Sequence, residues 1–262
     1  MKITISIINE CGKIKAFNEG EDSVNLVYDQ GYDNGDVIKV TTTDKNCFYQ
    51  IKIDETIENT NVYLTDNEWI YTIDFHKRNK SLHKNAFDKS VHYLYVKKAE
   101  SVSLLSNNPL DQEVNMGMYP HVSANAQTRG EPAFACVNII DGLAANTHHG
   151  KWPYTSWGIG GCEDACVTLE FGRVVVIEKV IVYLRAQFPH DSWWTEGVIK
   201  FGDECQCVLN FKKTKEGQVF QFDNIKTDKI SLGEFIKAND ESQFPSLSLI
   251  EVYGHELNKP VF

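Results

Sequence analysis

Short apolar segments that alternate with polar residues recur along the first hundred residues. The alternation is clear in Tyr49–Ile53 and Trp69–Ile73, and turn residues such as those of Gly31–Gly35 and Thr65–Asn67 separate the segments. Period-two alternation with β-branched and aromatic residues is typical of half-buried strands. The pattern predicts strands at Lys2–Ile8, Val24–Tyr28, Asp36–Thr42, Cys47–Ile53, Thr60–Leu64, Trp69–Phe75 and Val91–Val96. Seven short strands with frequent turns favour a β-sandwich, and this half carries no motif for catalysis.

The second half shows the same period, with no long helical repeat. It predicts strands at His121–Ala126, Ala165–Phe171, Val174–Leu184 with a break at Glu178, Cys205–Phe211, Gln218–Phe222, Lys229–Leu232 and Leu247–Tyr253. Gly233–Ala238 is interpreted as one helical turn. The predicted fold class is therefore all-β, with two tandem antiparallel β-sandwich domains of jelly-roll type. Linker-like residues place the boundary near residue 104, which gives domains 1–103 and 104–262.

Composition narrows the classes of partner. The 262 residues carry a formal net charge of −10 and a pI of about 5.3. An acidic chain is a poor match for nucleic acid, whose phosphates require a basic surface, and for anionic lipid. No signal-peptide core or membrane-length apolar run is present, and seven scattered cysteines suit a reducing compartment. The expected location is the cytoplasm, with no nucleic-acid or membrane partner.

Two loops concentrate aromatic and polar residues. His148–Gly158 and Arg185–Glu196 together hold four of the five tryptophans. Loops carry function more often than the strands they join. Sugar rings stack their C–H faces on aromatic rings, while their hydroxyl groups bond to charged or amide groups. The predicted ligand-binding residues are His148, His149, Trp152, Tyr154, Arg185, His190, Asp191, Trp193, Trp194 and Glu196. The alternative is that Trp157 and one of the Trp193/Trp194 pair close the sandwich as buried scaffold, because adjacent strand residues point to opposite faces.

Several fragments of the second half resemble a known group when taken in order. These are Asn138–Gly142, Ser156–Trp157, Val167–Gly172, Ile177–Arg185 and Ile250–Gly254. Over residues 110–256 they look like the galactose-binding-like β-sandwich of discoidin and coagulation-factor type C domains and of many bacterial carbohydrate-binding modules. The resemblance implies a jelly roll with a ligand site in its loops. The disulfide that commonly ties the domain ends in secreted members is absent, since no cysteine follows Cys207.

The resemblance also implies a structural calcium ion. In such modules the loop equivalent to 141–147 often binds Ca²⁺ together with a glutamate of the last strand, and Asp141, Thr147 and Glu251 match those positions. Hard oxygen ligands are what calcium requires. The alternative is an Asx turn in which Asp141 bonds its own backbone. A zinc site at His148, His149, His190 and Asp191 is disfavoured, because no spaced His/Cys motif is present.

The resulting prediction is a non-catalytic carbohydrate-binding protein whose sugar pocket lies in the loops of the second domain. One alternative is a hydrolase-type enzyme using His190, Asp191 and Glu196 for acid–base chemistry, although no nucleophile or phosphate-loop motif accompanies them. The other is a protein-interaction module that uses the aromatic surface. The sequence leaves open the identity of the sugar, the role of the first domain and the oligomeric state.

Overall fold

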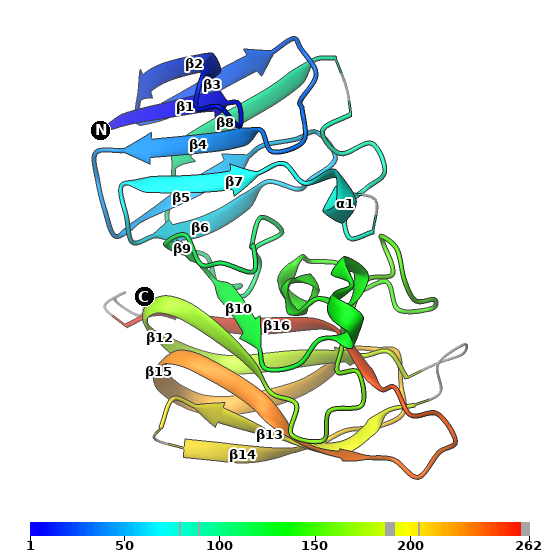
Figure 1. The fold of residues 1–262 in the computed structure, drawn as a ribbon. Coiled ribbons are helices and arrows are strands. Elements are labelled where there is room, and N and C mark those ends of the chain that lie inside the picture. Colours follow the sequence, from blue (N-terminus) through cyan, green and yellow to red (C-terminus); the bar gives the residue numbers. More distant parts are fainter. Residues whose placement is uncertain (79, 89, 187–191, 204, 258–262) are drawn as a thin grey trace.

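The fold is built almost entirely from antiparallel strands (Figure 1). The computed structural model of the chain describes residues 1–78, 80–88, 90–186, 192–203 and 205–257. Figure 1 shows the N-terminal half stacked on the C-terminal half, each with its own strands. Buried apolar residues form two separate clusters, one in each half, as expected when each half folds around its own core. The predicted all-β class is confirmed. No helix in the described part of the chain is long and apolar enough to span a membrane.

The N-terminal half contains two sheets that face each other across one core. Their elements are β1 (Lys2–Ile8), β2 (Ile14–Glu21), β3 (Ser23–Tyr28), β4 (Val37–Thr42), β5 (Cys47–Lys52), β6 (Thr60–Leu64), β7 (Glu68–Thr72), α1 (Phe75–Arg78), β8 (His92–Lys98) and β9 (Met118–Tyr119). One sheet has the order β2-β1-β4-β7 and the other β3-β8-β5-β6-β9. Trp69 is buried between them, as its place in an alternating strand predicts. The sequence pattern missed β2, because this edge strand has few buried side chains.

The C-terminal half is organised by two long strands. Its elements are β10 (His121–Ala124), η1 (Thr128–Gly130), η2 (Pro132–Phe134), η3 (Cys136–Ile140), β11 (Trp157–Gly158), β12 (Val167–Leu184), β13 (Trp194–Phe201), β14 (Cys205–Asn210), β15 (Gln218–Lys237) and β16 (Ser246–Glu256). β12 pairs with β10 through residues 167–170 and with β16 through residues 175–184. β15 pairs with β13 through its later residues and with β12 along most of its length. The two long strands therefore join the two faces of one β-sandwich around the C-terminal core.

Two sequence-based assignments differ from the structure in this half. Gly233–Ala238 is not a helical turn; it lies almost entirely in β15, where Phe235 packs its ring against Trp194 and Trp157. Pairing with β13 and burial of that ring outweigh the local helical preference. The predicted break at Glu178 coincides with a register shift between Ile177 and Lys179, but β12 continues through it as a β-bulge.

The segment that connects the halves contributes residues to both hydrophobic cores. Leu105 donates a backbone hydrogen bond to Val252 of β16 and packs in the C-terminal core. Leu110 and Met118 then return to the N-terminal core, and β9 pairs with β6. The chain therefore contacts the C-terminal core at residues 104–106 and returns to the N-terminal core before β10 begins. A cut between 1–103 and 104–262 stays a prediction.

The bend of β12 at Gly172 is also a contact between the halves. Gly172 has a φ of 71°, and a Cβ atom there would overlap the ring of Tyr119 in β9. Gly172→Ala is expected to lower the free energy of unfolding by about 2–4 kcal/mol, since a left-handed backbone and overpacking both cost energy. Gly161→Ala is the matched control, because Gly161 has a φ of 82° but open space around it. Urea unfolding of both variants measures the difference, and equal losses would refute the role of the Tyr119 contact.

Candidate functional site

Arg185 lies at the end of β12 with its side chain inside the loop end of the C-terminal sandwich. It is 4% exposed. Its Nη1 donates to Ser156 Oγ at 3.1 Å and its Nη2 to Ser246 Oγ at 3.0 Å, while its backbone N donates to Ser246 O at 3.0 Å. β12 and β16 are paired neighbours, so the sheet register itself brings Arg185 beside Ser246. The guanidinium is thus fixed by two hydroxyl groups.

Among the residues that the structure describes, the charge of Arg185 has no ionic partner. Among the described residues no carboxylate lies within ion-pair distance of it, and its Nε is buried without a hydrogen-bond acceptor. Burial lowers the pKa of Arg185 to about 10. A guanidinium has five N–H donors, and the two serines accept from only two of them. Proteins rarely bury a charge without pairing it, so this arginine is a strong candidate for a ligand-binding group.

A small pocket of about 150 Å³ opens over Arg185. The aromatic rings of Phe134 and Phe244 contribute to its lining, together with His149. Arg185 lies 5.9 Å from the centroid of the Phe134 ring, which is within cation–π range. Burial, and next the charge of Arg185, lower the pKa of His149. The imidazole is therefore neutral at pH 7, with one donor and one acceptor nitrogen.

The sequence-predicted residues divide between this pocket and the scaffold. Arg185 and His149 both line the pocket. Trp157 is fully buried and donates from Nε1 to Ala126 O at 2.8 Å. Trp194 is the buried member of the tryptophan pair and stacks on Phe235 with ring centroids 4.3 Å apart. Trp193 is half-buried against the same core.

Other predicted residues lie away from Arg185 or outside the described chain. Trp152 packs edge-on against His83 of the N-terminal half, and its backbone N donates to Lys80 O. His148 and Tyr154 contact each other with ring centroids 5.0 Å apart. Glu196 lies within β13, where its neighbours are Asn210 and Ile236. His190 and Asp191 lie outside the described residues.

Sequence reasoning missed the apolar walls and the two serines of the pocket. Phe134 is the last residue of the 3₁₀ helix η2, and Phe244, which is 53% exposed, lies two residues before β16. The sequence signal for this wall of the pocket is Phe244 followed by Pro245 and Ser246 at the start of a strand. Ser156 had been used only for the fold resemblance. Phenylalanine and serine occur throughout the chain, so their roles emerge only once the loops are placed together.

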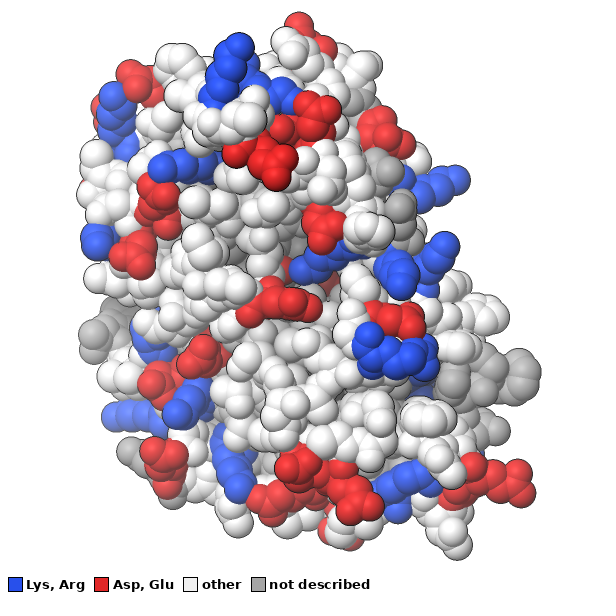
Figure 2. All heavy atoms as spheres, in the orientation of Figure 1, with Lys and Arg blue, Asp and Glu red and all other residues white. Residues whose placement is uncertain are grey.

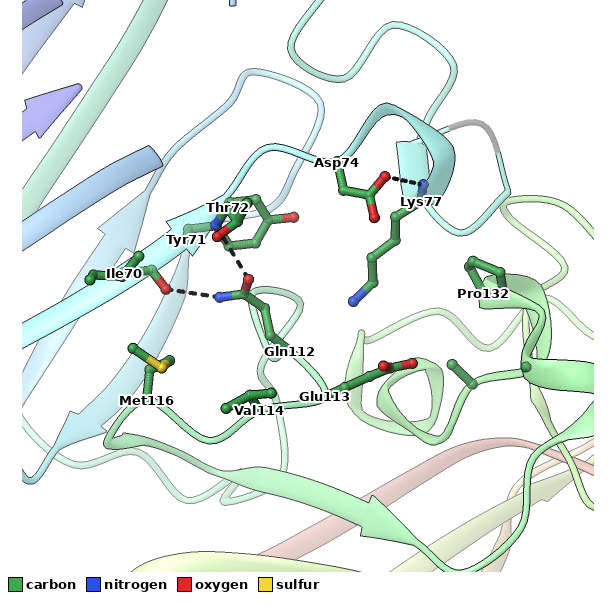
Figure 3. A pocket seen from close by; sticks show the side chains of 12 residues that line it. Ile70, Tyr71, Thr72, Asp74, Lys77, Gln112, Glu113, Val114, Met116 and Pro132 are labelled. Atoms are coloured by element: carbon green, nitrogen blue, oxygen red, sulfur yellow. Dashed lines mark hydrogen bonds between the residues drawn. The ribbon is translucent and has the colours of Figure 1, made fainter. Parts of the chain in front are cut away.

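A larger depression lies between the two halves (Figure 3). Its volume is about 470 Å³, and Figure 3 shows Lys77 and Glu113 on opposite sides of it. Gln112 bonds the edge of β7, donating to Ile70 O at 2.9 Å and accepting from Thr72 N at 3.3 Å. The depression is wide, and its charged groups are largely solvated. Because none of its described lining residues has a buried polar group without a partner, we rank it below the Arg185 pocket as a ligand site.

The charge distribution agrees with the acidic composition. Figure 2 shows acidic and basic side chains interspersed over the drawn face, with no extended basic surface on it. Oppositely charged side chains also pair at or near the surface, as Lys39 does with Glu68 and Lys200 with Glu234. Exposed pairs of this kind contribute little to stability. This face offers no electrostatic track for nucleic acid.

Solved structures similar to this chain cover about half of its length. No protein-family profile matches the sequence, and no curated protein matches it. Among solved structures, the chain is similar to the family 32 carbohydrate-binding module of Clostridium perfringens NanJ in complex with galactose (17% identity, 50% of this chain and 91% of that one, TM-score 0.38). It is also similar to a fucose-binding module of Streptococcus pneumoniae (10% identity, 59% of this chain and 100% of that one, TM-score 0.43). A third similar structure is the lectin domain of lectinolysin complexed with Lewis B antigen (13% identity, 52% of this chain and 93% of that one, TM-score 0.42).

These similarities agree with the resemblance found in the sequence. Carbohydrate-binding modules and discoidin-like lectin domains are the structures that about half of this chain resembles. At these identities and TM-scores they carry no argument about a ligand or a site. The assignment of function below therefore rests on the geometry around Arg185.

Proposed function

We propose that the chain binds carbohydrate without catalysis, in the pocket over Arg185. The observation that carries the proposal is a buried guanidinium that is fixed by Ser156 and Ser246, lacks a carboxylate partner among the described residues, and lines an open pocket. Its remaining N–H donors suit the hydroxyl oxygens of a neutral sugar. Charge-assisted hydrogen bonds are the stronger kind, so a few of them are enough to orient one ring.

The rest of the pocket matches the two-sided chemistry of a sugar ring. The rings of Phe134 and Phe244 offer apolar surface to C–H groups, and the neutral imidazole of His149 can donate to or accept from a hydroxyl group. A volume of about 150 Å³ corresponds to about five water molecules at roughly 30 Å³ each. A space of that size suits one terminal sugar residue rather than the middle of a long chain.

A glycan array followed by calorimetry tests the proposal. The array should contain terminal galactose, N-acetylgalactosamine and fucose, the sugars that the similar structures contain or are described as binding. We expect binding to a subset of terminal sugars with a dissociation constant of about 0.1–1 mM for the free monosaccharide, as a few hydrogen bonds and one stacked ring provide. Absence of binding to every glycan at millimolar concentration would overturn the proposal. Release of reducing sugar from a bound glycan would favour the hydrolase alternative.

We also propose that Asp141 contributes to a calcium site, the role that the family resemblance gives it. Its carboxylate accepts from Leu143 N at 2.8 Å and from Thr155 Oγ1 at 3.3 Å, which is the Asx turn of the alternative interpretation. Burial raises the pKa of Asp141 to about 8. A half-buried carboxylate without a basic partner among the described residues suits a cation. Thr147 is exposed, and Glu251 accepts from the Tyr183 hydroxyl at 3.2 Å.

The raised pKa of Asp141 predicts a pH-dependent stability in metal-free buffer. The unfolded carboxyl has a pKa of 3.8 and the folded one about 8, so the folded chain holds an extra proton between these values. Stability therefore falls as pH rises through this window, by at most about 1.4 kcal/mol per pH unit. Asp141→Asn should flatten that fall in urea unfolding between pH 5 and pH 7.5. An unchanged slope in the variant would contradict the assignment.

Calcium should reverse this effect if Asp141 is a ligand. A bound Ca²⁺ favours the charged carboxylate, so saturating Ca²⁺ should raise the melting temperature at pH 7.5 and EDTA should lower it again. Asp141→Asn should abolish the response, and Glu241→Gln, at an exposed acidic position, serves as the matched control. If Ca²⁺ does not change the melting temperature, Asp141 is not a calcium ligand and its role is that of an Asx turn.

A further inference from the structure

Three potential metal ligands converge in the N-terminal half, far from the Arg185 pocket. Asp54 and Glu55 follow β5, and His92 is the first residue of β8. One ligand atom from each of the three lies within 4.8 Å of the other two. The side chains of Asp54 and His92 are fully buried, and that of Glu55 is 27% exposed. Strand β8 pairs with β5, which explains how residues far apart in sequence meet here.

The spacing within the cluster suits a shared cation better than direct hydrogen bonds. His92 Nδ1 lies 3.7 Å from Asp54 Oδ2 and 3.7 Å from Glu55 Oε2, and both distances are too long for hydrogen bonds. Zinc–nitrogen and zinc–oxygen bonds of about 2.0–2.2 Å place neighbouring ligand atoms about 3.4 Å apart in a tetrahedral site.

The backbone orients both carboxylates toward the cluster. Asp54 Oδ1 accepts from Thr56 N at 2.8 Å and from Thr56 Oγ1 at 2.6 Å, and its Oδ2 accepts from Phe87 N at 2.7 Å. Glu55 Oε1 accepts from Tyr93 N at 2.6 Å, which leaves Oε2 as the atom nearest His92. Hydrogen bonds to the outer atoms of ligands are a regular feature of metal sites, where they fix the ligand geometry.

Tyr32 provides an independent observation. Its side chain packs against the His92 ring with centroids 4.5 Å apart, and the residue is only 7% exposed. Its hydroxyl is buried and has no hydrogen-bond partner in the part of the chain that the structure describes. A buried hydroxyl without a partner points to a group that the protein itself does not supply, such as a metal-bound water.

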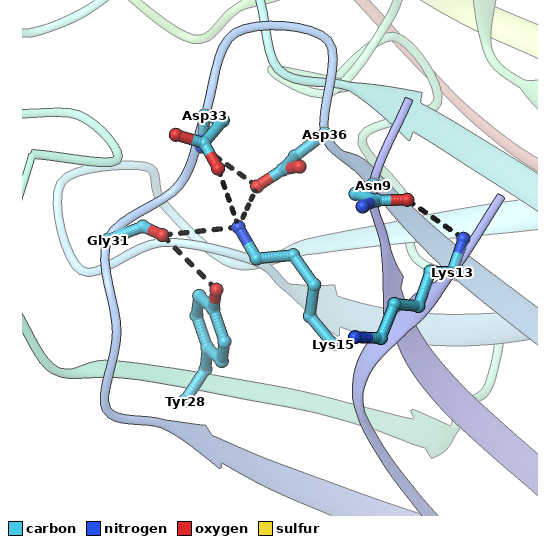
Figure 4. A network of polar contacts seen from close by, with 7 residues as sticks. All are labelled: Asn9, Lys13, Lys15, Tyr28, Gly31, Asp33 and Asp36. Carbon is cyan, nitrogen blue, oxygen red and sulfur yellow. Dashed lines mark hydrogen bonds and ion pairs between the residues drawn. The ribbon is translucent and has the colours of Figure 1, made fainter. Parts of the chain in front are cut away.

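The neighbouring Asp36 shows how this half neutralises a buried carboxylate by itself. Its Oδ2 accepts from Lys15 Nζ at 2.6 Å, within the network drawn in Figure 4. Asp33 and the backbone carbonyl of Gly31 also accept from the same ammonium group. Among the described residues no lysine or arginine takes that place beside Asp54, whose ion-pair partner there is His92.

We propose that Asp54, Glu55 and His92 bind one divalent transition-metal ion of the zinc class. A set of one imidazole and two carboxylates suits such ions, whereas calcium takes oxygen ligands alone. Three protein ligands leave at least one coordination position for water. The site would stabilise the N-terminal core by joining β5 to β8. It is independent of carbohydrate binding in the other half.

Metal titration of the whole chain tests this site. Protein stripped with a chelator is titrated with Zn²⁺ by calorimetry and with Co²⁺ by absorption spectroscopy. We expect one ion per chain, with a dissociation constant for Zn²⁺ at or below about 10 μM. The Co²⁺ spectrum should lack thiolate-to-metal charge transfer, which separates this site from the seven cysteines. A strong thiolate band, or no saturable binding, would overturn the proposal.

Variants locate the ion. Glu55→Gln should weaken Zn²⁺ at least about 10-fold, and His92→Gln should abolish binding at this site. Glu58→Gln removes a nearby exposed carboxylate as the matched control and should leave affinity unchanged. Because His92 is buried, its variant risks misfolding; the partly exposed Glu55 keeps the test valid. Equal affinity of wild type and Glu55→Gln would show that the cluster is only a buried His–carboxylate ion pair.

Discussion

Arg185→Met is expected to remove carbohydrate binding without destabilising the fold. Methionine fills a similar volume but has no N–H donor for a sugar hydroxyl. Hydrogen bonds to charged groups contribute about 1.5–3 kcal/mol each, so losing two should weaken binding at least about 100-fold. Calorimetry with the best sugar from the array measures this loss. Arg129→Met is the control, because Arg129 lies at the same pocket but is exposed and paired with Glu131 at 2.7 Å.

The stability of the same variant separates binding from folding. Burial lowers the pKa of Arg185 from its ordinary value to about 10, which corresponds to roughly 3 kcal/mol of unfavourable desolvation. Methionine relieves this cost but leaves Ser156 and Ser246 without their donor, at about 1 kcal/mol each. The free energy of unfolding should therefore stay level or rise by about 1 kcal/mol. A large loss of stability would show that Arg185 is a structural residue and would weaken the assignment of the pocket.

Trp194→Ala is expected to have the largest effect on stability in the C-terminal half. Trp194 is 1% exposed and stacks on Phe235 at 4.3 Å, so truncation leaves a large cavity in the sandwich. Large-to-small changes at buried tryptophan cost about 3–5 kcal/mol. Urea unfolding should show this loss. Sugar binding by the remaining folded protein should be little changed, because Trp194 does not line the pocket.

Trp193→Ala is the matched comparison in the same dipeptide. Trp193 is only half-buried against the core, so its truncation should cost about 1–2 kcal/mol. The two adjacent tryptophans thus test the idea that one member of the pair is scaffold. Equal losses for the two variants would contradict the burial difference on which this interpretation depends.

Much of the fold was predictable because residues that face the core alternate with exposed residues along most strands. Strand β1 was predicted with its observed bounds, and β6 likewise, since their buried side chains alternate. The edge strand β2 was missed because its exposed side chains carry no such period. Residues 233–238 were misassigned because their strand conformation depends on packing of Phe235 against distant aromatic rings. Tertiary contacts decide such segments, and a local pattern does not contain them.

The candidate site was predictable only in part. An arginine after an apolar strand and a histidine in a neighbouring loop were recognisable as polar ligand groups, and the structure brings Arg185 and His149 to one pocket. The walls formed by Phe134 and Phe244 depend on how three loops meet. The cluster of Asp54, Glu55 and His92 was missed for the same reason, because no spacing motif links residues joined only by strand pairing.

An NMR titration with the best-binding sugar tests the central claim most directly. Backbone amide shifts report where a ligand contacts the chain. The account predicts that saturable changes concentrate at residues 128–134, 149, 156–158 and 244–246, which surround Arg185. It also predicts no comparable changes around residues 70–77 and 112–116, which line the larger depression between the halves. Changes centred on that depression, or no changes at millimolar sugar, would contradict the account.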